Sequence, residues 1–254
     1  MRTTADQAAT RVAIRGAGGR MGQRLVALTE ADPALALAKA FDRAVPISGE
    51  ALREVEAGVV IDFSSADSLP GTIDAVVAAG AAMVIGTTGL SEADHARLDA
   101  AAAEVPVLEA SNFSMVVNVL HDLVARAVRL LGEGWDLEIA EAHHRHKKDA
   151  PSGTALALAR TLAEAAGRDP DCILTQRSGD DVPRQPNDIT VQSTRIGDDP
   201  GQHTVYLAGL GERLELKHVA TNPDSYALGA LRAAKWIVGR PARRYTMAEV
   251  LGLS

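Results

Sequence analysis

The chain has 254 residues, enough for one large domain or two modest ones with a hydrophobic core. Its net charge of −7 argues against binding a nucleic-acid backbone, and an aromatic content of 3% argues against recognising bases by stacking. A single cysteine, Cys172, excludes an internal disulfide bond and a cysteine-based zinc site.

No apolar run approaches the ~20 residues that a membrane-spanning helix needs. The N-terminal segment MRTTADQAAT also lacks the apolar stretch of a signal peptide. We therefore expect a soluble, cytoplasmic protein that has neither a membrane nor a nucleic acid as its partner.

From Arg11 to about Ser111, short apolar runs alternate with alanine-rich helical stretches. Strands alternating with helices are typical of a parallel sheet covered on both faces. The expected strands are 11–15, 35–41, 59–64, 81–88 and 105–111, and the expected helices are 21–32, 66–79 and 91–103. The last of these helices starts with Ser91 and Asp94, spaced as an N-terminal cap and its acidic support.

The first strand leads into a glycine-rich turn, RGAGGRMG, and then into a helix. In that context the turn predicts a dinucleotide site, in which the backbone approaches a pyrophosphate at the helix N-terminus. The strict G-x-G-x-x-G spacing is not met, because one extra residue precedes Gly22. The alternative is a tight turn without a ligand.

Asp42 ends the second strand, about 20 residues after the last glycine, where an acidic residue binds the adenosine ribose. Arg43 follows directly. An acid favours the free 2′-hydroxyl of NAD, whereas an arginine can hold the 2′-phosphate of NADP. The pair suggests relaxed cofactor choice, with a solvated surface arginine as the alternative for Arg43.

Two later strands end in small polar residues, in the segments GTTG and ASNFS. Ligands of open parallel sheets bind beyond the carboxyl ends of the strands. Gly86, Thr87 and Thr88 therefore suit an approach to ribose or nicotinamide, as do the residues from Ser111 to Phe113. Taken singly, each segment is equally well explained as a turn.

After Phe113 the pattern changes to longer alternating runs. We expect helices at 116–131 and 152–166, a strand at 136–144, and strands within 188–198 and 203–221 with a hairpin at Gly209 and Gly211. A last helix, 226–239, is expected to pack back on the first domain. The fold class is α/β: a Rossmann-like dinucleotide-binding domain (1–112 and 225–254) plus an α+β substrate-binding and oligomerisation domain (113–224) with a mixed or antiparallel sheet.

The segment EAHHRHKKDAPSGTA, residues 141–155, combines three histidines with two lysines and a Ser-Gly-Thr. A zinc site is disfavoured, because no cysteine or H-E-x-x-H pattern supports the histidines and the lysines would repel a cation. A solvated charge run is the ordinary alternative. We favour an anion pocket, because Ser152, Gly153 and Thr154 would start a helix whose N–H groups bind carboxylates, and Lys147 adds charge.

The same segment resembles the signature of the dihydrodipicolinate reductase family, E-A-H-H-R-H-K-x-D-A-P-S-G-T-A. The GAGGRMG turn, GTTG and NFS resemble the cofactor-binding elements of that family, in the same order. The resemblance extends from Arg11 to the C-terminal helix. It implies a two-domain enzyme, usually a homotetramer, that reduces a cyclic unsaturated dicarboxylate to tetrahydrodipicolinate with NADH or NADPH.

The resemblance also implies roles for single residues. His143 would donate a proton, and Lys147 would be a second donor or an electrostatic partner. The substrate carboxylates would be bound by His144, Gly153 and Thr154, to which our own argument adds Ser152. The cofactor would contact Gly16, Ala17, Gly18, Gly19, Arg20, Met21, Asp42, Gly86, Thr87, Thr88, Ala110, Ser111, Asn112 and Phe113. Arg232 is a weaker candidate, and His146 has no assigned role.

The chain departs from the family pattern at two positions near the expected cofactor site. Ser65 stands where some members carry an arginine, and Val116 lies in NFSMVVN where a glycine often follows NFS. Two rival functions stay open: a nucleotide-binding sensor without catalysis, and a dehydrogenase of another small acid with a similar two-domain build.

Overall fold

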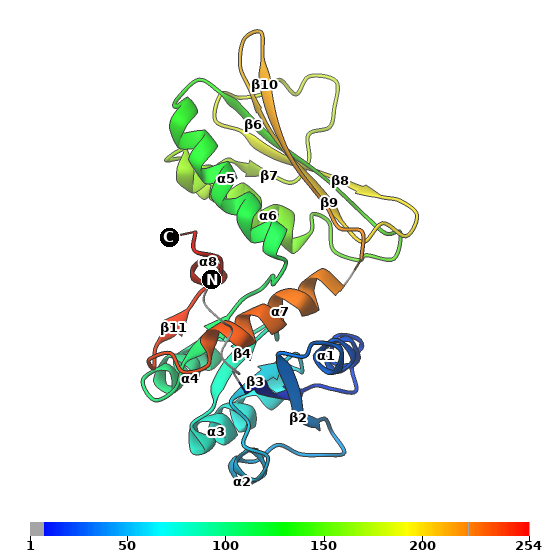
Figure 1. Ribbon diagram of the computed structural model, residues 1–254. Helices are drawn as coiled ribbons and strands as arrows, with labels where there is room; N and C mark the ends of the chain where they lie inside the picture. The colour runs from blue at the N-terminus through cyan, green and yellow to red at the C-terminus, as the bar shows by residue number, and fades with distance from the viewer. Residues whose placement is uncertain (1–7, 223, 254) are drawn as a thin grey trace, which may run out of the picture. The chain divides into compact units, whose positions relative to one another are not determined.

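The computed structural model describes residues 8–222 and 224–253. Most of the N-terminal segment MRTTADQAAT, which is not expected to be a signal peptide, therefore lies outside the described residues. Within the described residues the chain forms two compact units, one of residues 8–115 and 224–253 and the other of residues 116–222. Each unit is built on its own sheet (Figure 1).

The sheet of the first unit is entirely parallel, with the strand order β11-β5-β4-β3-β1-β2. Every residue of β3 and β4 is buried, which explains why these strands stand in the sequence as unbroken apolar runs. The predicted parallel sheet is confirmed. Its strands are β1 (Thr10–Arg15), β2 (Leu35–Phe41), β3 (Val59–Asp62), β4 (Ala82–Ile85), β5 (Val107–Glu109) and β11 (Arg244–Tyr245).

Helices cover both faces of this sheet, as the alternating pattern predicts. Val12 and Ile14 of β1 pack into a core with α1, α7 and α8, whereas Ala13 belongs to a second core with α2, α3 and α4. The last long helix, α7, therefore packs on the first sheet, as expected (Figure 1). The helices are α1 (Arg20–Ala31), α2 (Gly49–Glu54), the 3-10 turn η1 (Ala66–Ser68), α3 (Leu69–Ala79), α4 (Glu92–Ala102), α7 (Asp224–Ile237) and α8 (Met247–Leu251).

The cap expected at α4 is present in full. The Ser91 hydroxyl accepts a hydrogen bond from the Asp94 N–H, and the Asp94 carboxylate accepts one from the Ser91 N–H. By contrast, α2, α8 and β11 were not predicted from the sequence. Each has between two and six residues, too few for a period of 3.6 or 2 to show.

The second unit has a mixed sheet of order β10-β9-β6-β8-β7, as expected. β6 pairs with β8 in parallel and with β9 antiparallel, and β9 and β10 form the predicted hairpin. One face of the sheet packs against α5 and α6, with Leu137, Ile139 and Val205 in the shared core. The elements are α5 (Met115–Leu131), β6 (Asp136–His143), α6 (Gly153–Ala165), the 3-10 turn η2 (Pro170–Cys172), β7 (Ile173–Leu174), β8 (Ile189–Arg195), β9 (Gln202–Ala208) and β10 (Arg213–Val219).

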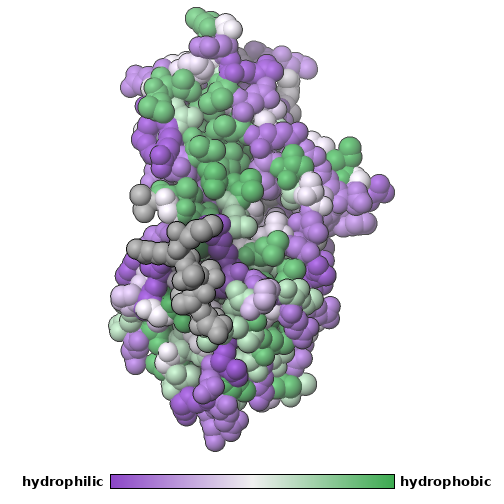
Figure 2. Space-filling view, viewed as in Figure 1, coloured by the Kyte–Doolittle hydropathy of each residue, from purple (hydrophilic) through white to green (hydrophobic). Residues whose placement is uncertain are grey.

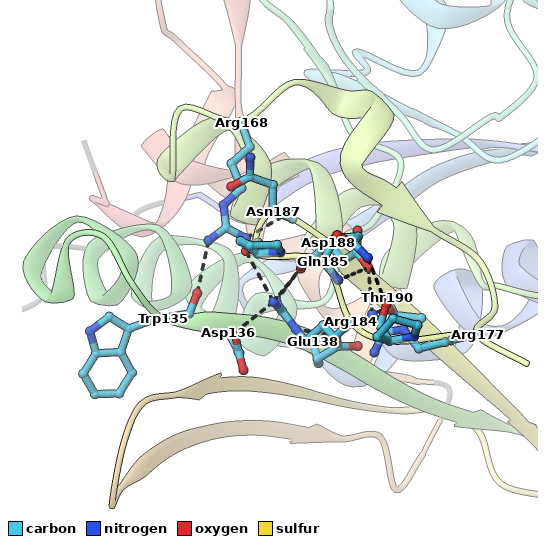
Figure 3. Close-up of polar contacts among 12 residues, drawn as sticks. Trp135, Asp136, Glu138, Arg168, Arg177, Arg184, Gln185, Asn187, Asp188 and Thr190 are labelled. Carbon is cyan, nitrogen blue, oxygen red and sulfur yellow. Dashed lines mark hydrogen bonds and ion pairs between the residues drawn. The ribbon is translucent and has the colours of Figure 1, made fainter. Parts of the chain in front are cut away.

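The opposite face of this sheet carries a cluster of charges (Figure 3). Glu138 alternates with the core residues of β6 and so points away from the helices. Its Oε1 atom accepts hydrogen bonds from Arg177 at 3.3 Å and from Arg184 at 3.2 Å. Arg177 also donates hydrogen bonds to Asp188 and Thr190. The segment between β7 and β8 is thereby fastened across the outer face of the sheet.

Helix α5 buries one apolar stripe and exposes another. Val116, Leu123 and Leu130 lie seven residues apart and are 59%, 46% and 86% exposed. Figure 2 shows apolar side chains gathered on the helical side of this unit. Even so, none of the described helices is both long enough and apolar enough to cross a membrane.

Candidate active site

The glycine-rich turn can be built only with glycine at two of its positions. Gly16 has a φ of +86°, and a Cβ atom there would lie 2.5 Å from the carbonyl oxygen of Phe63. A Cβ atom on Gly22 would lie 2.1 Å from the carbonyl oxygen of Gly16. The glycine that breaks the strict spacing thus lets the first turn of α1 pack directly on the loop.

A cavity of about 530 Å³ opens beside this turn. It brings together residues predicted to bind the pyrophosphate (Gly16, Gly18, Gly19) with Asp42 and Arg43, predicted to act on the ribose. Arg20 is exposed at the start of α1, whereas Ala17 and Met21 pack against the core. The other residues lining the cavity are Arg15, Ala44, Phe63, Ser64, Ser65 and Ser68.

Asp42 uses its two carboxylate oxygens differently. Oδ1 accepts hydrogen bonds from the N–H groups of Ala44 and Val45, at 2.8 and 3.0 Å. Oδ2 faces the turn, since a Cβ atom on Gly18 would lie 3.5 Å from it. The carboxylate is therefore held rigidly with one oxygen directed at the loop, which fits an acceptor for ribose hydroxyls.

Arg15 is a cavity residue that sequence reasoning missed. It is the last residue of β1, and its NH1 atom donates to the carbonyl oxygen of Asp42 at 2.6 Å. The position directly before the first glycine could have drawn attention to it. Arg15 and Arg43 thus give this cavity two cationic side chains.

The GTTG segment is tied into the scaffold by its side chains. The Thr87 hydroxyl is buried and donates to Asp62 Oδ1 at 2.8 Å, and a Cβ atom on Gly86 would lie 2.2 Å from the Phe63 ring. Thr88 is exposed. The hydroxyl of Thr87 thus supports the end of β3, so contact between Thr87 and a cofactor is expected through its backbone. Asp62, fully buried, is a second residue that the sequence did not reveal.

The ASNF segment lies at the end of the first unit, after β5. Phe113 is buried against Phe63, with 5.6 Å between the ring centroids. Its carbonyl oxygen packs against Gly229 of α7, where a Cβ atom would lie only 1.8 Å away. The Asn112 side chain accepts from the Ser114 N–H at 2.8 Å, while Ala110 is half-buried and Ser111 exposed. Phe113 therefore anchors this segment to the core, and Ser111 is the residue it presents to solvent.

In the second unit, a polar row crosses the helix-covered face of the sheet. Strand pairing places Glu141 of β6 opposite Ser193 of β8 and His203 of β9, and His203 opposite His218 of β10. Two residues further back along β6, the same face carries Ile139 in the apolar core. The face thus changes from apolar to polar toward the end of β6 that carries His143.

His143 is held by a buried carboxylate. Its Nδ1 atom lies 2.6 Å from Oε2 of Glu141, whose side chain is fully buried. Arg195 donates to both oxygens of that carboxylate at 2.9 Å, and the Ser152 N–H donates to Oε1 at 3.2 Å. Burial would raise the pKa of Glu141, but the hydrogen bonds from Arg195, His143 and Ser193 outweigh it and lower the pKa. Glu141 is therefore an anion, and its Oε2 atom accepts a hydrogen bond from Nδ1 of His143.

The His203 ring packs against that of His143, with 5.2 Å between the ring centroids, and is kept neutral. Burial, followed by the nearby charges of His143, His218 and Lys147, lowers the pKa of His203 to about 3. Its Nε2 atom lies 3.2 Å from the Ser152 hydroxyl, which also accepts from the Ala155 N–H and so caps α6. Ser152 is only 2% exposed. Its hydroxyl supports the turn, and we no longer expect it to touch the substrate directly.

The remaining predicted substrate ligands lie in the loop after β6 and at the start of α6. Gly153 and Thr154 are its first two residues, at the positive end of the helix dipole. Lys147 Nζ lies 2.9 Å from Asp149 Oδ1, and this hydrogen bond lowers the pKa of Asp149. His144 instead lines a shallow cavity with Arg145, His146, Gly197 and Asp198. In the described part of the chain, no three His, Cys, Asp or Glu side chains gather in a way that could hold a metal ion.

Comparison with known families accounts for both units. The family model for the N-terminus of dihydrodipicolinate reductase matches residues 10–113, and the model for its C-terminus matches residues 116–251. The chain belongs to the dihydrodipicolinate reductase family. A 4-hydroxy-tetrahydrodipicolinate reductase of Alkalilimnicola ehrlichii is 45% identical over 266 residues, 96% of this chain and 99% of the relative. One of Anaeromyxobacter dehalogenans strain 2CP-1 is 43% identical over 265 residues, with 96% and 98% covered.

Solved structures share the fold. The dipicolinate-bound dihydrodipicolinate reductase from Paenisporosarcina sp. TG-14 has a TM-score of 0.78 at 20% identity, covering 95% of this chain and 99% of the other. An engineered D-amino acid dehydrogenase bound to NADP+ has a TM-score of 0.57 at 14% identity, with 97% and 96% covered. These likenesses confirm the predicted fold class, a dinucleotide-binding α/β domain joined to a second domain with a mixed sheet.

The two departures from the family pattern, and the weaker site candidate Arg232, fall on identifiable places in the structure. Ser65 lines the cofactor cavity, where its hydroxyl lies 3.3 Å from that of Ser68. Val116 is exposed in the first turn of α5. Arg232, on α7, contacts the sulfur of Met115 at 3.4 Å. Of the three, only Ser65 lies where it can alter the cofactor cavity directly.

Proposed function

We propose that the chain reduces 4-hydroxy-tetrahydrodipicolinate (dihydrodipicolinate) to tetrahydrodipicolinate with NADH or NADPH, in lysine and diaminopimelate biosynthesis. The observation that carries the proposal is the fixed His143. Its ring is bound by a buried carboxylate next to the N-terminus of α6, in a chain whose family relatives are 4-hydroxy-tetrahydrodipicolinate reductases along their whole length.

The first unit fits a nicotinamide dinucleotide. The glycines at 16, 18 and 19 line a cavity of about 530 Å³ beside the N-terminus of α1, where a pyrophosphate can approach the backbone. Among the described residues no N–H or O–H group donates to Oδ2 of Asp42, so this oxygen suits the ribose, while Arg15 and Arg43 supply positive charge for a 2′-phosphate. When bound, NADH or NADPH supplies the hydride.

The second unit fits a small dicarboxylate. The N-terminus of α6, at Gly153 and Thr154, offers N–H groups and the positive end of a helix dipole to one carboxylate. Lys147 and His144 are the side chains we assign to the rest of the substrate. Lys147 can leave its ion pair with Asp149 to bind the substrate at a small cost in free energy, because the Asp149 side chain is largely exposed and stays solvated.

The proton comes from His143. Hydride addition to a conjugated C=C–C=N system leaves negative charge that an acid must neutralise. Because Nδ1 is bound to Glu141, proton transfer to the substrate has to use Nε2. Within the described residues Nε2 has no hydrogen-bond partner, and it faces Gly201, on which a Cβ atom would lie only 2.9 Å away. Lys147 stabilises the developing charge.

The roles of His143 and Lys147 are tested by His143→Gln and Lys147→Ala. Each is expected to lower kcat by at least ~100-fold, the size of a general-acid contribution. NADH affinity, measured by fluorescence titration, should stay within about 2-fold. Lys148→Ala, next to Lys147 and exposed, is the matched control and should keep normal turnover. Normal kcat in both site variants would remove them from the mechanism. A panel of other small acids distinguishes this reductase from a dehydrogenase of different substrate.

We also propose that the chain works as a homotetramer in the cytoplasm. In the described part of the second unit, the sheet face opposite α5 and α6 carries no helix (Figure 1), and a second copy could pack against the charged segment that crosses it. Sedimentation velocity on the purified protein tests the assembly, and a monomer at assay concentration would contradict it.

A further inference from the structure

We propose that Glu141 is a positioning residue whose single carboxylate fixes the His143 ring and the substrate-binding turn together. The inference rests on the proposed function, because it concerns how His143 donates its proton. Glu141 does not need to touch the substrate, since its side chain is fully buried.

The two oxygens of the carboxylate hold different parts of the site. Oε2 binds Nδ1 of His143 at 2.6 Å, and Oε1 binds the N–H of Ser152 at 3.2 Å. Ser152 is the N-cap of α6, whose first N–H groups we assign to the substrate carboxylate. The Glu141 carboxylate thus fixes the distance between the proton donor and the turn that binds the substrate carboxylate.

Arg195 makes this arrangement possible. A buried carboxylate is costly unless it is paired and its lone pairs are used. Arg195 contributes two parallel hydrogen bonds of 2.9 Å, and its NH2 atom also binds the Asp149 carbonyl oxygen at 2.5 Å. The guanidinium therefore keeps Glu141 charged and ties the loop after Lys147 to the same carboxylate.

The consequence for catalysis is the tautomer of His143. An anionic Glu141 keeps a proton on Nδ1, so in the neutral ring Nε2 is the bare nitrogen that takes up the proton to be delivered. Without the carboxylate, the ring can carry its proton on Nε2 and can rotate about its side-chain bonds. The imidazolium that donates the proton would also lose the anion that stabilises it, and a rotated ring would no longer hold Nε2 in place.

The experiment compares Glu141→Gln with Glu138→Gln. Glu138 lies on the same strand and also binds arginines, but it points to the opposite face and has no part in the site. Steady-state kinetics gives kcat and KM for substrate and NADPH. Nitrogen-15 NMR of histidine-labelled protein reports the His143 tautomer at neutral pH, with His143→Gln used to assign its signals. Circular dichroism checks folding.

For Glu141→Gln we expect a loss of kcat of ~100-fold, of the order that general-acid catalysis contributes. KM for NADPH should stay within about 2-fold, and the His143 signals should move from the Nδ1–H form toward the Nε2–H form. Glu138→Gln should leave both readouts unchanged. Kinetics and tautomer unchanged in Glu141→Gln would overturn the inference. Wild-type protein without turnover would instead defeat the proposed function, while the tautomer measurement could still be made.

If Glu141→Gln does not fold, Arg195→Lys replaces it. Lysine keeps the charge but cannot make two parallel hydrogen bonds. We expect a smaller loss of kcat, about 10-fold, with the same unchanged KM for NADPH. Wild-type kcat in a folded Arg195→Lys would overturn the claim that Arg195 orients Glu141.

Discussion

Burial of His203 makes the stability of the second unit depend on pH. In the folded chain the pKa of His203 is lowered to about 3, by burial first and then by neighbouring charges. In the unfolded chain an ordinary histidine titrates near 6.5. Between these two values the unfolded state binds a proton that the folded state rejects. Stability from this group is therefore complete above about pH 6.5 and is lost as the pH falls toward 3.

The expected slope is at most about 1.4 kcal/mol per pH unit, so lowering the pH from 7.0 to 5.0 should cost about 2 kcal/mol. His218 and His121, whose pKa values burial also lowers, act in the same direction. Glu141 does not contribute in this range, because its lowered pKa affects stability only below about pH 4.5. The window from pH 6.5 to 5.0 therefore reports the buried histidines.

The assay is urea unfolding followed by tryptophan fluorescence at pH 7.0 and 5.0. A Trp236→Phe background leaves Trp135 as the reporter in the second unit. His203→Gln should flatten the pH dependence while lowering stability at pH 7.0, since Gln cannot titrate but packs less well. His146→Gln, at an exposed position, is the control and should retain the wild-type slope. Equal wild-type stability at both pH values, or an undiminished slope in His203→Gln, would refute the argument.

Two further predictions concern the cofactor site. Gly22→Ala should weaken NADH binding by ~10-fold or more and lower Tm, because its Cβ atom would lie 2.1 Å from a backbone oxygen. The control, Gly71→Ala, should change neither, because a Cβ atom there would have no atom within 4 Å. Fluorescence titration of both variants decides, and unchanged NADH affinity in Gly22→Ala would contradict the geometry. Asp42→Ala should weaken NADH more than NADPH, and Arg43→Ala the reverse, by about 1 kcal/mol each as typical for one polar contact. Equal effects on the two cofactors would show that neither residue discriminates.

The fold could be predicted from the sequence where the signal is local and long. The strands of the first sheet are buried on both faces, so each one stands out as an apolar run. The last helix, α7, was also expected, together with its packing on the first sheet. The short elements α2 and β11 escaped because they are placed by tertiary packing, with β11 paired to β5 over only two residues.

The candidate site was only partly predictable, for a related reason. Gly16, Asp42 and His143 stand in motifs whose spacing is visible along the chain. Glu141 and Arg195 are 54 residues apart and meet because β6 and β8 pair in register, which the sequence does not show. Glu141 itself could have been suspected, because a residue two positions before His143 on a strand faces the same side.

Burial also changed how two predicted residues are understood. Thr87 and Ser152 stand in motifs that indicate ligand binding, but their hydroxyls are engaged within the scaffold. A motif shows which segment approaches a ligand, whereas the structure shows which atoms of that segment remain available.

The central claim is tested most directly by a coupled assay in which the preceding synthase supplies the substrate and the oxidation of NADH or NADPH is followed. We predict that the purified protein consumes one reduced cofactor for each substrate formed, with either cofactor, and that His143→Gln loses this consumption while still binding NADH. No substrate-dependent oxidation by the wild-type protein with either cofactor would contradict the account.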